Sequence, residues 1–424
     1  MTMIYALILF AVTYVLMLTF TKYRPYIALG SAVVFIVTGM LPFDQIFGAI
    51  DWNVLLMIAG TMGLVQLFID SRMPARLADM IMLKVPNVQM AAVALALFAG
   101  IISAFVDNVA TVLMVAPVAL AICKKLKTNP VPFIIGIAVS SNLQGAATLV
   151  GDTTAIMLGS YADMSFLDFF WYKGRPGIFF AVELGAIASA LILAWLFRKE
   201  KDSIEQRGEL TPVTDYVPTV LLVGMIALLI SASFIPVKPD ITNGLICVSL
   251  FIIGMVYTFA RTRSADAFLG PIKSIDFETI GLLFGLFLVI GGITNMGVVD
   301  AAAGLLARMG GGNVFVIYTV IVWASVLFSA FIDNIPYVAT MLPVVTGLAS
   351  TLGIDPTLLY FGLLSGATLG GNCTPIGASA NITGIGILRR EGYEVKTGDF
   401  CRIGIPFTLA AVIPAYIYFW LLYA

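Results

Sequence analysis

The chain has 424 residues, of which 60% are hydrophobic and only 11% are charged, and its formal net charge is −1. Soluble globular proteins carry about 25% charged residues, so this composition indicates an integral membrane protein. Apolar runs of about 20 residues recur along the chain, which favours membrane-spanning helices over the short alternating segments of a β-barrel. The near-zero net charge gives no reason to expect a nucleic-acid partner.

Two residue types restrict the chemistry that this chain can carry out. Histidine is absent, which excludes a Ser-His-Asp triad and any metal site built on imidazole. The four cysteines include no CxxC pair, so neither a disulfide framework nor a zinc ribbon is predicted. We therefore expect no enzyme, no cofactor and no resident metal ion.

Apolar segments long enough to enter a bilayer fall into two sets of six. The first set covers residues 3–20, 26–42, 52–69, 90–123, 131–160 and 177–197. The second set covers residues 217–235, 241–260, 278–296, 314–348, 357–386 and 403–423. The first segment has no basic region before it and no small-residue cleavage site, so we expect a retained helix rather than a signal peptide. A polar segment, residues 198–216, is predicted to be a linker between the two sets.

Two sequence motifs occur once in each set. Residues 103–117, SAFVDNVATVLMVAP, match residues 329–343, SAFIDNIPYVATMLP, at seven of fifteen positions, with Asp107 opposite Asp333. The same offset aligns residues 145–156, GAATLVGDTTAI, with residues 371–382, GNCTPIGASANI. Because two motifs keep one offset, the chain is predicted to contain a duplicated unit.

The basic residues indicate how each unit crosses the membrane. If segments 90–123 and 314–348 are re-entrant hairpins, 19 of the 23 Lys and Arg residues fall on one face, as cytoplasmic loops require. If each of these two segments crosses the membrane once, 13 Lys and Arg residues fall on one face and 10 on the other. Two full crossings would preserve the 19-to-4 split, but arms of about 17 and 15 residues are marginal for spanning. We therefore predict hairpins, both termini outside and the linker inside.

This topology predicts the fold class and the domain organisation. We expect an all-α polytopic membrane protein with two inverted repeats, residues 1–197 and 217–424, and about ten transmembrane helices. Each repeat also carries one re-entrant hairpin and one broken helix, the latter at residues 131–160 and 357–386. An odd number of crossings per repeat makes the repeats inverted, as in many alternating-access transporters.

Each predicted hairpin carries an acid and an amide in its turn, Asp107 with Asn108 and Asp333 with Asn334. A charged side chain deep in a bilayer costs about 2.5–3.5 kcal/mol on insertion scales, so such residues usually have a function. The alternative is that each acid only caps the returning helix. Capping needs one such residue, whereas each turn has two.

The predicted broken helices place Gly, Thr and Asn residues, and in the second one Pro375, inside apolar segments. Unwound backbone is tolerated at membrane depth only where it is buried in protein or lines a cavity. Two half-helix ends that meet at such a break offer carbonyl and N–H groups to an ion. Asp152 adds a third buried carboxylate in the first repeat, and its counterpart in the second is Ala378, so the two breaks are expected to differ chemically.

The segments SAFVDNVATVLMVAP, GAATLVGD, SAFIDN and GGNCTPIGASAN resemble the signature segments of the ion transporter superfamily. The resemblance is strongest to ArsB-type arsenical pumps and the melanosomal P protein, and weaker to sodium/proton antiporters of the same branch and to dicarboxylate and citrate carriers. It implies a scaffold domain and a transport domain, with substrate bound between the hairpin turns and the helix breaks. The chain departs from many relatives after Asp152, where Thr153, Thr154 and Ala155 replace Pro-Pro-Asn.

These segments supply the candidate site residues. The proton-coupling candidates are Asp107, Asp152 and Asp333. The substrate-binding candidates are Asn108, Asn142, Thr148, Asn334, Asn372, Cys373, Thr374, Ser379 and Asn381. Cys373 is also the candidate ligand for a metalloid, because a soft thiolate suits trivalent arsenic.

The leading functional hypothesis is export of arsenite or antimonite in exchange for protons. Sodium/proton antiport is the first alternative, because buried carboxylates with Thr and Asn oxygens suit a hard cation. A dicarboxylate or citrate carrier is a further alternative, although the motifs contain no Lys or Arg to attract an anion. A channel is a different class that the sequence leaves open.

The expected setting is the cytoplasmic membrane of a prokaryote, with the lipid bilayer, a small inorganic substrate and protons as partners. A homodimer is suggested only by analogy with relatives. Whether a soluble ATPase takes part cannot be inferred from the sequence.

Overall fold

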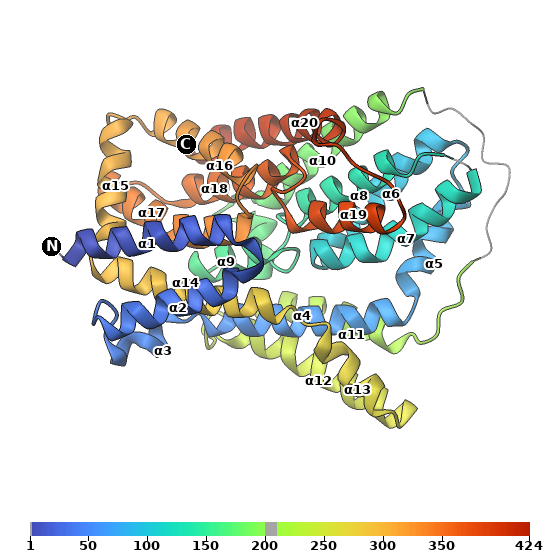
Figure 1. Ribbon diagram of the computed structural model, residues 1–424, viewed down its shortest axis with the longest axis horizontal. Helices are drawn as coiled ribbons and strands as arrows, with labels where there is room; N and C mark the ends of the chain where they lie inside the picture. The colour runs from blue at the N-terminus through green and yellow to red at the C-terminus, as the bar shows by residue number, and fades with distance from the viewer. Residues whose placement is uncertain (1, 127, 200–209) are drawn as a thin grey trace.

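The computed structural model of the chain is almost wholly helical over the residues that it describes, 2–126, 128–199 and 210–424 (Figure 1). The first-half helices are α1 (Thr2–Thr19), α2 (Arg24–Val37), α3 (Ile46–Ala49), α4 (Trp52–Asp70), α5 (Met73–Met82), α6 (Val88–Ser103), α7 (Asn108–Leu126), α8 (Val131–Gln144), α9 (Thr153–Tyr161) and α10 (Ile178–Leu196). The second-half helices are α11 (Val217–Ser233), α12 (Thr242–Thr262), α13 (Ala265–Lys273), α14 (Phe277–Asn295), α15 (Val298–Met309), α16 (Val314–Ser329), α17 (Asn334–Leu352), α18 (Thr357–Gly370), α19 (Ser379–Arg390) and α20 (Thr397–Tyr423). The shorter elements are four 3-10 turns, η1 (Thr21–Tyr23), η2 (Phe43–Gln45), η3 (Phe166–Phe169) and η4 (Gly371–Cys373), and two antiparallel strands, β1 (Trp171–Tyr172) and β2 (Arg175–Pro176). The predicted all-α polytopic fold class is confirmed.

The described helices include fewer full spans than the ten or so that the sequence predicts. Seven of them are long and apolar enough to cross a membrane, and nine spans result if each of two bent pairs counts as one. These pairs are α1 with α2 and α15 with α16, each bent by 117°. Gly311 and Gly312 lie at the second bend with φ of 59° and 76°, a backbone conformation that glycine adopts readily. α11, which falls in the predicted segment 217–235, has 17 residues and is slightly shorter than these spans.

Four interruptions of the helices place polar backbone inside the protein. The first turn (residues 104–107) separates α6 from α7, and the second turn (residues 330–333) separates α16 from α17. The first break (residues 145–152) separates α8 from α9, and the second break (residues 371–378) separates α18 from α19. These positions coincide with the two motifs that recur at one common offset.

Helix packing follows a matched pattern in the two halves. α6 packs on α8 and α16 packs on α18, while α4 lies along α12 and α2 lies along α14. α10 and α20, the last helix of each half, also pack on each other. The duplicated unit and the inverted relation of its two copies stay predictions from the sequence.

α18 is buried along its whole length, which requires small residues where it meets α16. Gly362, Gly366 and Gly370 recur at every fourth position on the face of α18 that contacts α16. A Cβ atom added at Gly366 would lie 2.5 Å from the carbonyl oxygen of Val322. Small residues at this spacing let two helices in a membrane protein approach closely. The tight contact fixes the helix that leads into the second break.

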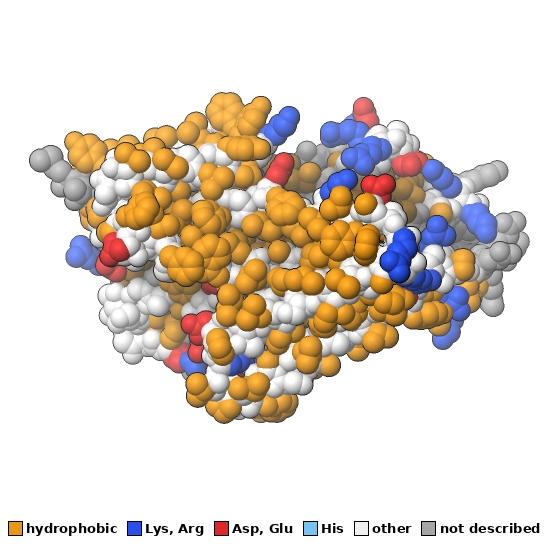
Figure 2. Space-filling view, turned by 90° about the horizontal axis from the view of Figure 1, so that it is seen from below, with side chains coloured by type: hydrophobic (Ala, Val, Ile, Leu, Met, Phe, Trp, Pro, Cys, Tyr) orange, Lys and Arg blue, Asp and Glu red, His pale blue; other side chains and the backbone are white. Residues whose placement is uncertain are grey.

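Charged and apolar side chains occupy different parts of the surface. Hydrophobic side chains cover a broad area in Figure 2, whereas Lys and Arg side chains gather towards one end. In Figure 1 that end holds α5, and the N-terminus lies at the opposite end. The basic end is the one that the hairpin topology predicts to face the cytoplasm. Which end faces which side of the membrane stays a prediction.

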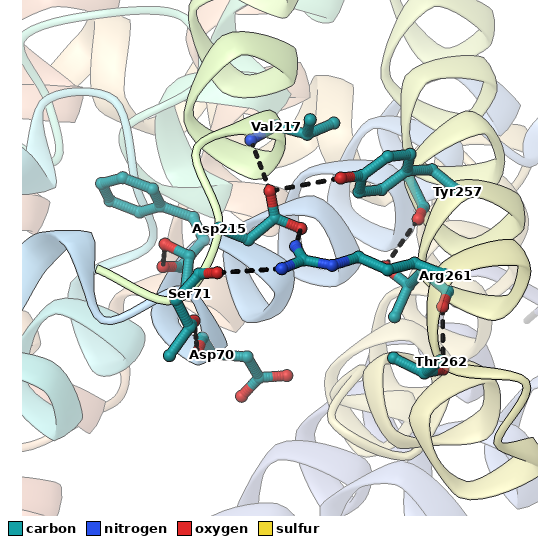
Figure 3. Close-up of polar contacts among 11 residues, drawn as sticks. Asp70, Ser71, Asp215, Val217, Tyr257, Arg261 and Thr262 are labelled. Carbon is teal, nitrogen blue, oxygen red and sulfur yellow. Dashed lines mark hydrogen bonds and ion pairs between the residues drawn. The ribbon is translucent and has the colours of Figure 1, made fainter. Parts of the chain in front are cut away.

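The described end of the predicted linker is fixed at this basic end, while residues 200–209 of the linker lie outside the described residues. The backbone N–H of Thr214 donates to the carbonyl of Ser71 at 3.0 Å. The carboxylate of Asp215 forms an ion pair with Arg261 of α12 (Figure 3). The linker end is therefore tied both to the turn after α4 and to α12.

Candidate substrate-binding site

The first turn holds the acid and amide pair of the first repeat. The Asp107 carboxylate accepts the backbone N–H groups of Val109 and Ala110 at 3.0 and 3.1 Å, and so caps α7. Asn108 is 4% exposed, and its side-chain N–H group donates to Oδ1 of Asn142 at 3.1 Å. Capping therefore accounts for part of the role of Asp107, and the amide beside it makes a separate contact.

The second turn carries the same pair in a different setting. Asp333 caps α17 by accepting the backbone N–H of Ile335 at 3.2 Å. Its other carboxylate oxygen accepts from the Arg24 guanidinium and from the Ser379 hydroxyl, both at 3.2 Å. The two turns thus share a capping acid but differ in the partners that reach it.

Asp152 ends the first break, directly before α9. Its carboxylate accepts from the Thr153 N–H and the Thr154 hydroxyl, both at 2.8 Å. It also accepts from the Asn334 side chain at 3.3 Å, which joins the first break to the second turn. Asp152 and Asn334 are only 4% and 3% exposed. Ala378 stands at the equivalent position of the second break, so the site has one such acid and not two.

A matched hydrogen bond ties each break to its neighbouring turn. The Thr148 hydroxyl donates to the Ala104 carbonyl, and the Thr374 hydroxyl donates to the Ala330 carbonyl. The two donors are equivalent positions of the repeated motifs, and so are the two acceptors. These two threonines therefore hold backbone in place.

Two glycines show how closely each break approaches its turn. A Cβ atom added at Gly151 would lie 2.6 Å from the Gly145 carbonyl oxygen, and one added at Gly377 would lie 2.6 Å from the Gly371 carbonyl oxygen. Each would also crowd carbonyl oxygens of the adjacent turn. A side chain at either position would push the break away from the turn, since packed interiors have little spare volume.

Two buried amides connect the halves. The Asn142 side chain of α8 donates to Oδ1 of Asn372 at 3.0 Å and to the Thr368 carbonyl at 2.6 Å. Asn372 in turn donates to the Val139 carbonyl at 3.0 Å. Both asparagines are completely buried. Their hydrogen bonds fix the second break against α8.

A small cavity of about 130 Å³ lies where the two turns meet the first break. Predicted site residues from both halves line it, namely Asp107, Asn108, Asp152, Asn334 and Ser379. They lie at the N-terminal ends of α7, α9, α17 and α19. Residues from distant parts of the sequence are thus brought together at one site.

The remaining candidates do not line the small cavity. Those that hold backbone or join the halves are Asn142, Thr148, Asn372, Thr374 and Asn381. Asp333 faces Arg24. Cys373 belongs to η4, which packs against α20. The predicted set therefore divides into residues that line a cavity and residues that shape it.

Sequence reasoning overlooks two residues of this region. Arg24 is counted there as a loop charge, yet its side chain is only 19% exposed and reaches Asp333. Asp276 is not among the predicted site residues, yet it lines the small cavity and caps α14 through Thr279. The cap of α14 could be recognised from the sequence. Arg24 gives no local signal, because its partner lies 309 residues away.

A large cavity of about 1480 Å³ lies among α4, α9, α14 and α17. The charged residues in its described lining are Asp44, Asp51, Asp163, Asp168, Lys238 and Asp240. Negative charge dominates this lining, so the cavity attracts cations more than anions.

Apolar helices that surround a buried polar site, with helix breaks contributed by both halves, define the class of this protein as a polytopic membrane transporter. The comparisons with known proteins narrow the class. A family model described as citrate transporter matches residues 14–361 and residues 244–424. The chain belongs to the citrate transporter family.

The chain is similar to several transporters over most of its length. It is 30% identical over 442 residues to an uncharacterized transporter of Mycobacterium tuberculosis, with 99% of both chains covered. It is 30% identical over 427 residues to the 46 kDa membrane protein of Mycobacterium leprae, with 99% and 98% covered. Human P protein is 29% identical over 387 residues, which cover 74% of this chain and 46% of that protein. These matches support the broad group predicted from the motifs and do not single out its arsenical pump branch.

A solved structure has a similar fold. The crystal structure of the Alcanivorax borkumensis YdaH transporter superposes with a TM-score of 0.62 and 14% sequence identity. The superposition covers 89% of this chain and 87% of that one. At this identity the likeness concerns the fold alone.

Proposed function

We propose that the protein is a secondary transporter that carries a small carboxylate such as citrate, together with a proton or another cation. The observation that carries this proposal is the make-up of the small cavity. It combines four helix N-termini with carboxylates, and its described lining contains no Lys or Arg. Exposure of this cavity to one side of the membrane at a time would move the substrate across.

The helix N-termini support an anionic substrate. The first backbone N–H groups of a helix have no partner within the helix, and the helix dipole places partial positive charge there. Anions bind at such ends without a basic side chain. Asp107, Asp152 and Asp333 already cap α7, α9 and α17, so the N-terminus of α19, which has no side-chain cap, is the one most open to an anion. Asn108, Asn334 and Ser379 add polar groups that can bond the hydroxyl and carboxylate oxygens of citrate.

The carboxylates support coupling to a cation. Asp107 and Asp152 line the same cavity, and no ion pair in the described part of the chain includes either one. A carboxylate substrate beside them is repelled unless a positive charge accompanies it, because charges interact strongly away from bulk water. Binding of the substrate would then require a proton or metal cation, which is the basis of coupled transport.

The charged residues that line the large cavity also support coupling of the substrate to a cation. With the predicted topology its loops face the outside of the cell. Its aspartates would then concentrate cations at the outer entrance and disfavour free anions. We therefore propose that substrate and cation enter together in a cytoplasmic membrane whose outer face carries both chain termini.

The hypotheses of metalloid and sodium transport rank below citrate. Export of arsenite or antimonite depends on Cys373 as a soft ligand, and Cys373 lies on η4 rather than in the lining of the small cavity. Sodium/proton antiport is the second candidate, favoured by the carboxylates of Asp107, Asp152 and Asp276 in one lining.

Transport assays on the purified chain in liposomes test this proposal. Uptake of radiolabelled citrate, arsenite, antimonite and sodium is measured in parallel, with and without an inward proton or sodium gradient. We expect gradient-stimulated citrate uptake that is lost in Asp152→Asn. Gradient-driven movement of sodium or arsenite without citrate uptake would overturn the proposal.

A further inference from the structure

The two turn acids occupy equivalent positions but have opposite electrostatic surroundings. Oδ2 of Asp333 lies 3.2 Å from Nη1 of Arg24, and the two side chains are only 12% and 19% exposed. The Arg24 guanidinium is further fixed because its Nε donates to the Met17 carbonyl at 3.2 Å. Asp107 forms no ion pair in the described part of the chain. One acid is therefore neutralised by a basic side chain and the other is not.

Arg24 is held in position by the bend between α1 and α2. It is the first residue of α2 and follows η1, the short turn after the 117° bend. Tyr14 of α1 donates to the Pro336 carbonyl at 2.6 Å and also contacts the Thr340 hydroxyl. The bent pair thus contacts the beginning of α17 at two places, through a tyrosine and through an arginine.

The second repeat contains no counterpart of this arginine. The segments DWNVLLMIAG, beginning at Asp51, and DFETIGLLFG, beginning at Asp276, are similar at an offset of 225 residues, and this offset places Ser249 opposite Arg24. Ser249 lies within α12 and carries no charge. The difference between the two turns therefore comes from outside the shared motif.

We propose that Arg24 is the fixed counter-ion of Asp333, so that the coupling cation binds on the Asp107 and Asp152 side of the small cavity alone. The part that concerns coupling rests on the proposed function. A cation or proton at Asp333 would have to displace a guanidinium and leave a shielded positive charge without a partner. At Asp107 and Asp152 it meets no competing basic group. Arg24 is thus a positioning residue, and Asp333 is removed from the predicted proton-coupling set.

Thermal unfolding of the purified chain tests the ion pair without any substrate. Arg24→Gln and Asp333→Asn should each lower Tm by several degrees, because each leaves one shielded charge alone. The double variant R24Q/D333N should recover most of that loss, and Arg24→Lys should retain part of the stability. Asp107→Asn and Asp152→Asn should not lower Tm in the same way. Additive losses in the double variant would overturn the pairing.

The number of cations taken up per citrate tests the assignment of coupling. In liposomes, R24Q/D333N should keep the wild-type ratio even if its rate falls, whereas Asp107→Asn and Asp152→Asn should lower the ratio. A lowered ratio in R24Q/D333N would place Asp333 back in the coupling path. If wild-type vesicles take up no citrate, the proposed function fails. Recovery of Tm in the double variant then still decides whether Arg24 and Asp333 neutralise each other.

Discussion

The turn at Asp107 and the turn at Asp333 share a motif but not an environment. In both, the acid caps the following helix and a buried asparagine comes next. Asp107 lines the small cavity together with Asp152, whereas Asp333 is paired with Arg24. The difference arises from residues that other helices bring to each turn. A duplicated motif can therefore keep its local structure while its two copies take on separate roles.

The largest effect is expected when a carboxylate on the Asp107 and Asp152 side of the small cavity is removed. Asp152→Asn should lower gradient-driven citrate uptake about 100-fold, which corresponds to ~2.8 kcal/mol. The amide can still accept from the Thr153 N–H but cannot bind a cation as a carboxylate does. Initial uptake rates measure the effect. Asp355→Asn is the matched control, because asparagine can also accept a backbone N–H and Asp355 accepts that of Thr357 outside both cavities. Near-normal uptake by Asp152→Asn would contradict the comparison.

The two turn asparagines sharpen the comparison by testing whether both turns face one substrate. Asn108→Ala and Asn334→Ala should each raise KM for citrate about tenfold, since one hydrogen bond to a charged group contributes ~1.5–3 kcal/mol. Asn334→Ala should have the larger effect, because it also removes a donor to Asp152. Concentration-dependent uptake gives both values. An unchanged KM in either variant would exclude that turn from the binding site.

The glycines of the breaks test the similarity of the two halves instead. Gly151→Ala and Gly377→Ala should destabilise the protein to a similar extent, by about 1–3 kcal/mol, because each added methyl group overpacks matched contacts. Denaturant unfolding of the purified variants measures the loss. Gly30→Ala, where an added Cβ meets nothing within 4 Å, is the control. Tolerance of one substitution and not the other would show that the two breaks are packed differently.

The smallest effect is expected at Cys373, the predicted ligand for a metalloid. Cys373→Ser should change citrate uptake by less than about twofold, as substitutions away from a functional feature usually do. The side chain belongs to η4 and stands outside the small cavity. The same vesicles can be tested with arsenite. Arsenite transport that disappears in Cys373→Ser would restore the metalloid hypothesis.

Much of the fold could be predicted because its key interruptions lie inside two repeated motifs. The turns at Asp107 and Asp333 and the breaks near Thr148 and Thr374 coincide with polar residues in apolar sequence. Polar groups in such segments must be satisfied within the protein, so their positions carry structural information. The bend between α1 and α2 was less evident, since the apolar runs on its two sides resemble separate crossings. The bend between α15 and α16 was missed because α15 lies outside the predicted apolar segments.

The orientation of side chains within a break could not be predicted. Unwound backbone has no helical period, so neighbouring residues face different partners. Asn372 donates to the Val139 carbonyl, Thr374 donates to the Ala330 carbonyl, and Cys373 lies on a turn that packs against α20. Contacts between distant parts of the chain, such as that between Arg24 and Asp333, leave no local pattern in one sequence.

Protection of two introduced cysteines tests the central claim, that both turns line one substrate cavity, most directly. Val109 and Ile335 are equivalent in the repeat and both line the small cavity. Val109→Cys and Ile335→Cys are made separately in a chain whose native cysteines are replaced, and their reaction with a thiol reagent is followed with and without citrate. Citrate should slow labelling at both positions in the presence of the coupling cation. Unaltered labelling at both positions, in protein that still transports citrate, would show that the substrate binds elsewhere.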